Sequence, residues 1–301
     1  MKKITNKLTL GILSVALMGI VFTACKKKGV TVAPPDPIGG FNSSNDVGAA
    51  NLLAHWSFDG SLNESISNTA PVTNLRTSFT TGVKGQALHL DSGFALYPVI
   101  AKLNLTNYGS VTVSCWVNTD NNGSKATNVF SLTQGTATQT DWNTGLFNML
   151  LETGHGKTTD DTLVLHPSYG TYITGTLKGG DNINDYGVRE TDFKTVHGTN
   201  KWVHYVARYR ALDSTMDVFA NGIVVSNVNY RKRSTGALAL SALGAQAIIG
   251  GFANAATGFS LSAVQPFEGM FTGNIDEVRF YNTALADADI SSLYQLELAG
   301  R

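Results

Sequence analysis

The chain has 301 residues, and its 22 basic and 22 acidic residues give a formal net charge of zero. Charged residues make up only 15% of the sequence and there are 31 glycines, a composition that fits an all-β domain with many tight turns. A nucleic-acid-binding domain would need a basic surface, and beyond residue 28 the one basic cluster is residues 231–233, which we interpret as a solvated loop. We therefore do not expect a nucleic acid as a partner.

The first 24 residues have the layout of a secretory signal. Three lysines precede an apolar run over residues 8–22, which is too short for a comfortable permanent membrane span. The run ends in Thr23, Ala24 and Cys25, which resemble the lipobox of bacterial lipoproteins, with Phe22 where that motif usually has leucine. The resemblance implies that Cys25 is acylated and anchors the chain to the cell envelope. The sequence resembles lipoproteins of the Bacteroidetes type, which implies the outer membrane. The alternative is a buried N-terminal helix.

Residues 25–50 are expected to form an acylated cysteine followed by a flexible tether. The segment is rich in Pro, Gly, Asn and Ser and has no apolar period, so it predicts an extended spacer. Lysines at 26–28 would lie beside the anchor, where anionic lipid headgroups attract them. The only other cysteine is Cys115, so acylation of Cys25 excludes a disulfide, and we expect Cys115 to pack as a small apolar side chain. One domain is predicted over residues 51–301.

Short runs rich in β-branched and aromatic residues recur through this domain, separated by Gly, Asn, Asp and Ser. This pattern predicts the strands of a sandwich or barrel. The runs are 53–58, 87–90, 111–117, 128–132, 146–151, 162–166, 203–209, 216–220, 247–250 and 273–281. Asn221 and Gly222 tolerate positive φ and predict a type I′ hairpin into residues 223–225. Apolar residues at helical spacing from Ile290 to Leu298 predict a helix behind Asp287.

Four motifs in order carry a family resemblance. They are residues 53–60 with the Gly-rich 82–90, residues 111–117 with a central tryptophan, residues 202–206 with the Asn-Gly hairpin, and residues 273–281 with the final helix. Together they resemble the laminin G-like family of concanavalin A-type domains. The resemblance implies an all-β, concanavalin A-like antiparallel jelly-roll sandwich with a short C-terminal helix. This fold serves lectins, adhesion modules, lyases and glycosidases, so the fold does not decide the function.

Metal binding is expected only in the form that the resemblance implies, which is a structural calcium ion. Asp59 and Asp276 resemble positions that contribute oxygen ligands to such sites in relatives. The alternative is that Asp59 caps a turn and Asp276 accepts hydrogen bonds at a strand end. Histidines at metal-ligand spacing are absent, which disfavours zinc.

Catalysis by paired carboxylates is a second hypothesis for the function. Jelly-roll glycosidases place carboxylates two residues apart on one strand face, and Glu190 and Asp192 have that spacing, but a third carboxylate is missing. A dyad could also draw on Glu152, Asp160 or Asp161. The alternative is that these acids lie on solvated loops.

The leading hypothesis is a non-catalytic carbohydrate-binding protein. Residues 135–200 lengthen the connection between core strands and are rich in aromatic and polar side chains, as a sugar site requires. The candidate ligand-binding residues are Asp141, Trp142, Asn143, Tyr172, Tyr186 and Arg189. The alternative for each aromatic is that it packs back onto the sandwich. A third hypothesis is an adhesion or protein-binding component of the envelope.

Overall fold

The structure is a computed structural model that describes residues 34–152, 161–184 and 186–301. The account below concerns Asp36–Arg301, which forms one compact unit. Within the described residues, no helix is long and apolar enough to cross a membrane.

Strands dominate Asp36–Arg301, and the one α-helix among its described residues, α1 (Asp287–Leu298), closes it. The strands are β1 (Leu52–Trp56), β2 (Thr73–Thr81), β3 (Gln86–Val99), β4 (Val111–Asn118), β5 (Ala126–Thr133), β6 (Phe147–Leu151), β7 (Thr162–Leu163), β8 (Leu165–Ile173), β9 (Thr176–Asp181), β10 (Val196–His197), β11 (Val203–Arg210), β12 (Thr215–Ala220), β13 (Ile223–Val224), β14 (Gln246–Ile249), β15 (Glu268–Gly269) and β16 (Phe271–Tyr281). Short 3₁₀ turns lie at Ser44–Asp46, Ala49–Asn51, Ala101–Leu103 and Ala255–Thr257.

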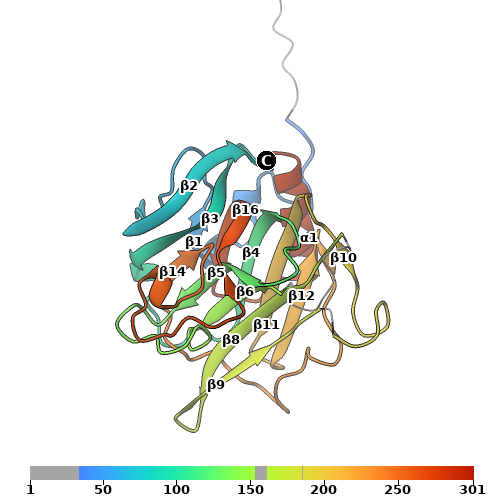
Figure 1. The fold of residues 1–301 in the computed structure, drawn as a ribbon. Helices are drawn as coiled ribbons and strands as arrows, with labels where there is room; N and C mark the ends of the chain where they lie inside the picture. The colour runs from blue at the N-terminus through green and yellow to red at the C-terminus, as the bar shows by residue number, and fades with distance from the viewer. Residues whose placement is uncertain (1–33, 153–160, 185) are drawn as a thin grey trace, which may run out of the picture. The chain divides into compact units, whose positions relative to one another are not determined.

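Most strands join one continuous sheet, in the order β13-β12-β11-β4-β16-β3-β14-β5-β6-β8-β9, with β1 on β16 and β2 on β3 (Figure 1). Every pairing along that order is antiparallel, whereas the short β15 runs parallel to β5. The sheet curls so that apolar side chains from distant strands enclose one core. At its centre Trp56 packs against Tyr97 and Phe130, with ring centroids 5.3 Å and 5.8 Å away. The predicted antiparallel jelly-roll architecture is confirmed.

Helix α1 is attached to the sheet through buried polar contacts. Trp116 of β4 donates its indole N–H to Glu297 Oε2 at 2.7 Å, and Arg279 of β16 donates to Glu297 Oε1 at 2.8 Å. Tyr294 stacks on Trp116 at 5.4 Å. Burial, partly offset by Arg279, raises the pKa of Glu297 to about 7. The predicted C-terminal helix is confirmed, with Asp287 in its first turn.

The start of the described chain packs on the same helix. Ile38, Phe41 and Val47 form an apolar cluster with Leu293 and Leu296 of α1. A 3₁₀ turn between them has a capping box, in which the Ser43 side chain accepts a backbone N–H. Residues 36–50 were expected to belong to the tether, but they are part of the folded unit.

Two local predictions hold in detail. Asn221 and Gly222 have φ of 51° and 78°, as a type I′ hairpin between β12 and β13 requires. Cys115 is fully buried in β4 and carries no disulfide, so it packs as a small apolar side chain.

Candidate functional site

Trp142 lies in the loop between β5 and β6, half-buried against two other aromatic rings. Its ring meets Phe252 edge-on at 5.7 Å and Phe267 at 5.8 Å. The loop is held by its own hydrogen bonds, because Gln139 Nε2 and Thr144 Oγ1 both donate to the Asp141 carbonyl, at 2.7 Å and 2.9 Å. The ring is therefore fixed before any ligand arrives.

A pocket of ≈ 290 Å³, the Trp142 pocket, opens beside this ring where β8 pairs with β9. Its lining is Trp142, Asn143, His166, Ser168, Tyr169, Gly179, Gly180, Asp181 and Arg233. Gly180 is required for the shape of the pocket, since a Cβ there would lie 2.5 Å from the Tyr169 hydroxyl. A small residue at 180 lets the Tyr169 ring form part of the wall.

Four charged side chains converge at the Trp142 pocket. His166 Nε2 lies 3.0 Å from Asp181 Oδ2, and its Nδ1 lies 3.5 Å from Glu152 Oε2. Arg233 contacts the other Asp181 oxygen at 3.3 Å. Burial alone would lower the pKa of His166, but the hydrogen bond to Asp181 and the nearby Glu152 carboxylate outweigh it and raise that pKa to about 9. His166 is therefore a cation at neutral pH, and the pocket offers both donors and anionic acceptors.

A buried polar row supports this pocket from behind. Asn128 donates to Ser131 at 2.7 Å, Ser131 to Asn148 at 2.6 Å, and Asn148 to Ser168 at 3.0 Å. The row crosses β5, β6 and β8 and ends on a lining residue. Such interlinked hydrogen bonds restrict side-chain rotation, so the floor of the pocket is preorganised.

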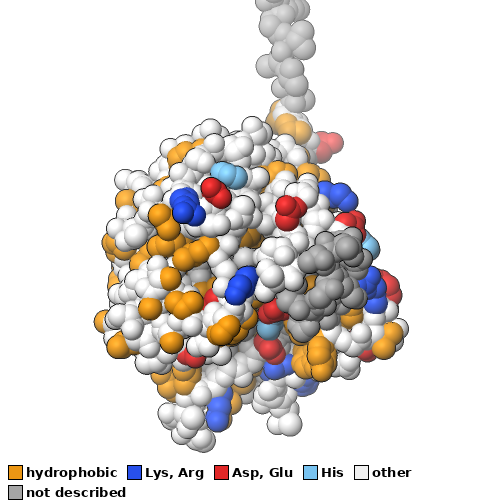
Figure 2. All heavy atoms as spheres, viewed as in Figure 1, with side chains coloured by type: hydrophobic (Ala, Val, Ile, Leu, Met, Phe, Trp, Pro, Cys, Tyr) orange, Lys and Arg blue, Asp and Glu red, His pale blue; other side chains and the backbone are white. Residues whose placement is uncertain are grey.

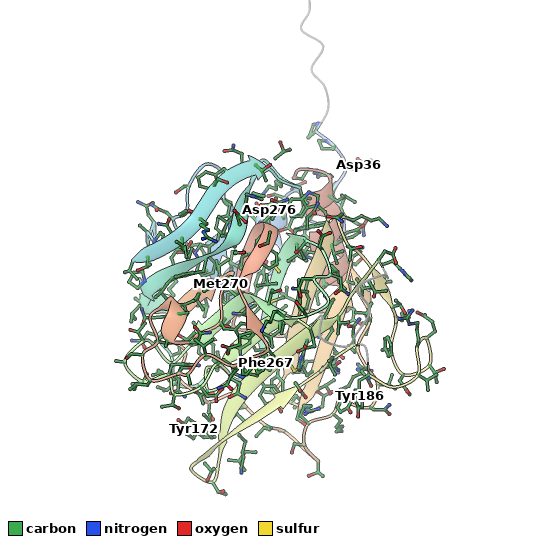
Figure 3. The ribbon with its side chains drawn as sticks, viewed as in Figure 1. Asp36, Tyr172, Tyr186, Phe267, Met270 and Asp276 are labelled. Carbon is green, nitrogen blue, oxygen red and sulfur yellow. The ribbon has the colours of Figure 1, made fainter. Side chains whose placement is uncertain are left out.

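The predicted ligand-binding residues do not all meet at one place. Trp142 and Asn143 line the Trp142 pocket and Asp141 precedes them, but the other three residues lie elsewhere. Tyr172 is 45% exposed at the end of β8, and Tyr186 is 54% exposed and packs edge-on against Tyr230 at 5.5 Å. Figure 3 shows Tyr172 and Tyr186 well apart. Arg189 is exposed in a turn that bridges to Phe193.

The carboxylates predicted for catalysis accept hydrogen bonds from the backbone of their own loop. Glu190 Oε1 accepts the Thr195 N–H at 2.9 Å, and Asp192 Oδ2 accepts the Val188 N–H at 2.6 Å. The backbone hydrogen bond from Thr195 lowers the pKa of Glu190. Both residues line a separate pocket of ≈ 260 Å³ beside Val224. They stabilise this turn and are not part of the Trp142 pocket.

The remaining acids of that hypothesis separate as well. Glu152 belongs to the Trp142 pocket through His166, whereas Asp161 pairs with the exposed His197 at 2.6 Å. Asp160 lies outside the described residues, and so does the predicted lipidation site Cys25.

Asp59 and Asp276 converge on one Gly-rich turn between β2 and β3. Asp59 Oδ1 accepts the Gln86 N–H at 2.8 Å, and Asp276 Oδ2 accepts those of Val83 and Lys84 at 2.8 Å and 3.2 Å. Burial raises the pKa of Asp276 to about 7. These donors fit a carboxylate that holds a turn, and no group of three metal-binding side chains occurs among the described residues. Calcium at Asp59 and Asp276 stays a prediction.

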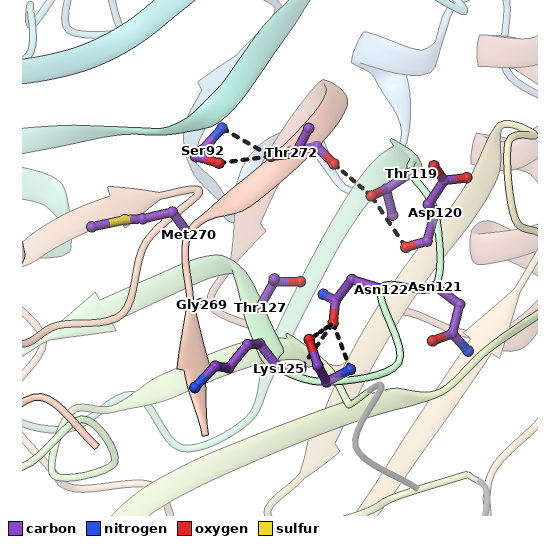
Figure 4. A pocket seen from close by; sticks show the side chains of 11 residues that line it. Ser92, Thr119, Asp120, Asn121, Asn122, Lys125, Thr127, Gly269, Met270 and Thr272 are labelled. Atoms are coloured by element: carbon purple, nitrogen blue, oxygen red, sulfur yellow. Dashed lines mark hydrogen bonds between the residues drawn. The ribbon is translucent and has the colours of Figure 1, made fainter. Parts of the chain in front are cut away.

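A second pocket, of ≈ 650 Å³, lies between the β4–β5 loop and the start of β16 (Figure 4). We call it the β4–β5 pocket. Its lining is mostly hydroxyl, amide and charged side chains, with one apolar residue, Met270: Ser92, Thr119, Asp120, Asn121, Asn122, Ser124, Lys125, Thr127, Gly269, Met270 and Thr272. Sequence reasoning missed this pocket. The run Asn121-Asn122-Gly123-Ser124 was the available signal, but it has the same composition as an ordinary turn.

Comparison with known proteins identifies the family. The family model for the concanavalin A-like lectin/glucanases superfamily matches residues 92–291, more than half of the chain. The chain belongs to this superfamily. A search of curated proteins finds no match.

Solved structures agree with this fold at low identity. The binding domain of Paraclostridial Mosquitocidal Protein 1 is 13% identical over 82% of this chain and 52% of that chain, with a TM-score of 0.50. A mutant of HCR/D is 14% identical over 83% and 52%, with a TM-score of 0.51. Domain 4 of AbnA, an extracellular arabinanase from Geobacillus stearothermophilus solved with arabinotriose, is 20% identical over 81% and 98%, with a TM-score of 0.49. This chain spans about half of each of the first two, and the likeness shows the fold.

Proposed function

We propose that this protein binds carbohydrate and that the Trp142 pocket holds one or more sugar rings. The superfamily to which the chain belongs includes lectins by name. The observation that carries the proposal is the arrangement of a fixed tryptophan next to the charge network of His166, Asp181 and Arg233.

The chemistry of a sugar matches this arrangement. A sugar ring presents a flat C–H face, which packs on an aromatic ring, and a belt of hydroxyl groups, which need donors and acceptors. The Asp181 carboxylate accepts from hydroxyls, and Arg233 and Asn143 can donate to them. Hydrogen bonds to charged groups are stronger than neutral ones.

Binding of the purified domain to soluble polysaccharides tests the proposal. The panel is arabinan, xylan, mannan, laminarin and pectin, measured by affinity electrophoresis and calorimetry. We expect Asp181→Ala to weaken binding about tenfold to a hundredfold, because a hydrogen bond to a charged group contributes about 1.5–3 kcal/mol. Asn143→Ala should weaken binding less.

Tyr186→Ala is the matched control, since Tyr186 is an exposed aromatic flanked by polar residues that does not line the pocket. Its affinity should equal that of the unmodified domain. Failure of every polysaccharide to bind, or an equal loss in Tyr186→Ala and Asp181→Ala, would count against the Trp142 pocket as the site.

We also propose that a lipid on Cys25 anchors the protein to the outer membrane, where the domain binds glycans. The support is the lipobox-like sequence before that residue. Cys25→Ser should release the protein from the membrane fraction and abolish palmitate labelling. Palmitate labelling that persists in Cys25→Ser would overturn the anchor.

A further inference from the structure

The segment from Pro266 to Met270 connects the β4–β5 pocket with the Trp142 pocket. Gly269 and Met270 line the first pocket, and Phe267 contacts Trp142, which lines the second. The Ala126 N–H donates to the Phe267 carbonyl at 2.9 Å, and β15 pairs with β5 directly after it. Lys125 Nζ also donates to the Pro266 carbonyl. Three contacts thus fix this segment against the β4–β5 loop.

Aromatic contacts link this segment to Trp142. Phe267 meets Trp142 at 5.8 Å and Phe252 at 6.0 Å. Gly269 and Met270 line both the β4–β5 pocket and a smaller pocket of ≈ 180 Å³ in which Phe252 lies. The β4–β5 pocket thus shares residues with the small pocket, and Phe252 of the small pocket contacts Trp142 of the Trp142 pocket.

The segment that connects the pockets, together with Val264 just before it, forms an exposed apolar ridge. Phe267 is 39% exposed and Val264 is 53% exposed, although both are large apolar side chains. Met270 is half-buried on the same segment, and Figure 3 labels it near Phe267. Figure 2 shows apolar side chains gathered on this face of the molecule. Apolar groups that stay exposed between two polar pockets need an explanation, because contiguous exposed patches mark binding surfaces.

We infer that the ligand is a polysaccharide bound along its length, from the Trp142 pocket across Phe267 and Met270 into the β4–β5 pocket. This inference rests on the proposed function and names its substrate class. An internal stretch of a chain alternates apolar ring faces with hydroxyl edges, and the surface alternates in the same way. Recognition of a terminal sugar would need only one pocket. Several weak subsites joined by one chain bind more tightly than any of them alone.

A ladder of oligosaccharides tests this inference. It is prepared by partial hydrolysis of whichever panel polysaccharide binds, from the disaccharide upward, and each fraction competes with the polymer for the purified domain. We expect affinity to rise with chain length and level off once both pockets are filled. Asp120→Ala, in the β4–β5 pocket, should weaken binding of long chains roughly tenfold, the loss of about one hydrogen bond to a charged group, and leave the disaccharide unaffected.

Phe267→Ala should remove the length dependence, because it breaks the ridge between the two pockets. Its matched control is Tyr172→Ala, an aromatic of similar exposure away from the ridge, which should bind like the unmodified domain. Thermal melts of all three variants separate a binding loss from unfolding. A disaccharide that competes as well as the polymer, or Asp120→Ala with unchanged binding of long chains, overturns the inference and leaves the proposed function intact. If no member of the panel binds, both fail.

Discussion

Replacement of Asp181 by Asn tests the charge network of the candidate site directly. His166 is 15% exposed and its pKa is raised to about 9 from 6.5, mainly by the Asp181 and Glu152 carboxylates, which overcome the effect of burial. A raised histidine pKa means that the folded state binds the proton more tightly than the unfolded state. The resulting stabilisation is complete below pH 6.5 and is lost as the pH rises through about 9.

The size of the effect follows from that interval. At about 1.4 kcal/mol per pKa unit, the full shift corresponds to about 3 kcal/mol. Because Glu152 supplies part of the shift and the Asp181 side chain is 43% exposed to screening solvent, the share of Asp181 is about 1–2 kcal/mol. Asp181→Asn should therefore lower the free energy of unfolding by about that much at pH 6. At pH 10 the difference should shrink to the contribution of the Arg233 contact.

Urea unfolding between pH 6 and pH 10, with an NMR titration of His166, measures both quantities. Asp161→Asn is the matched control, because Asp161 also pairs with a histidine but both partners are more than half exposed. It should leave the unfolding free energy unchanged. The reasoning is refuted if His166 titrates near pH 6.5 in the unmodified protein, or if Asp181→Asn destabilises equally at every pH.

Three further predictions concern the other sequence motifs. Gly85→Ala should lower the unfolding free energy by about 2–4 kcal/mol in urea melts, since φ is +73° and the new Cβ would lie 2.0 Å from Asp59 Oδ1. The control is Gly175→Ala, at φ +78° with open space around it, which should lower the unfolding free energy by about half as much. Equal losses in the two variants would contradict the clash with Asp59. If calcium binds at Asp59 and Asp276, the melting temperature should be higher with added calcium than with a chelator, and Asp59→Asn should lose this difference. An equal melting temperature of the unmodified protein in the two solutions rejects the ion. We expect that the protein releases no reducing ends from the polysaccharide that it binds. If reducing ends are released, and Glu190→Gln abolishes their release, the hydrolase alternative is established.

Much of the fold can be predicted from the sequence, because its strands carry their own signal. Residues 111–117 and 203–209 are continuous or alternating apolar runs that pair across the sheet. β2 was missed because Thr73–Thr81 is mostly exposed and polar, so its conformation depends on pairing with β3. β9 was missed because it contains Gly179 and Gly180, which weaken a strand pattern.

The candidate site was predicted only in part. Trp142 was found because it lies between polar residues in a long connection. Its partners Phe252, Phe267 and Arg233 come from segments far along the chain, and no local pattern links them to it. His166 has no other histidine at metal-ligand spacing, so the sequence gives no sign of its role. Its role depends on the β8–β9 pairing, which the sequence did not predict.

Trp142 and Tyr186 show why an aromatic residue among polar neighbours is an ambiguous signal. Both were predicted to bind ligand, and Tyr186 is the more exposed of the two. Exposure alone would favour Tyr186, yet its ring rests on Tyr230 beside a solvated turn. Trp142 is less exposed because it packs on two rings, and this packing holds it next to charged groups that can orient a sugar. A binding platform needs rigidity and polar neighbours at once, and these properties arise from tertiary packing.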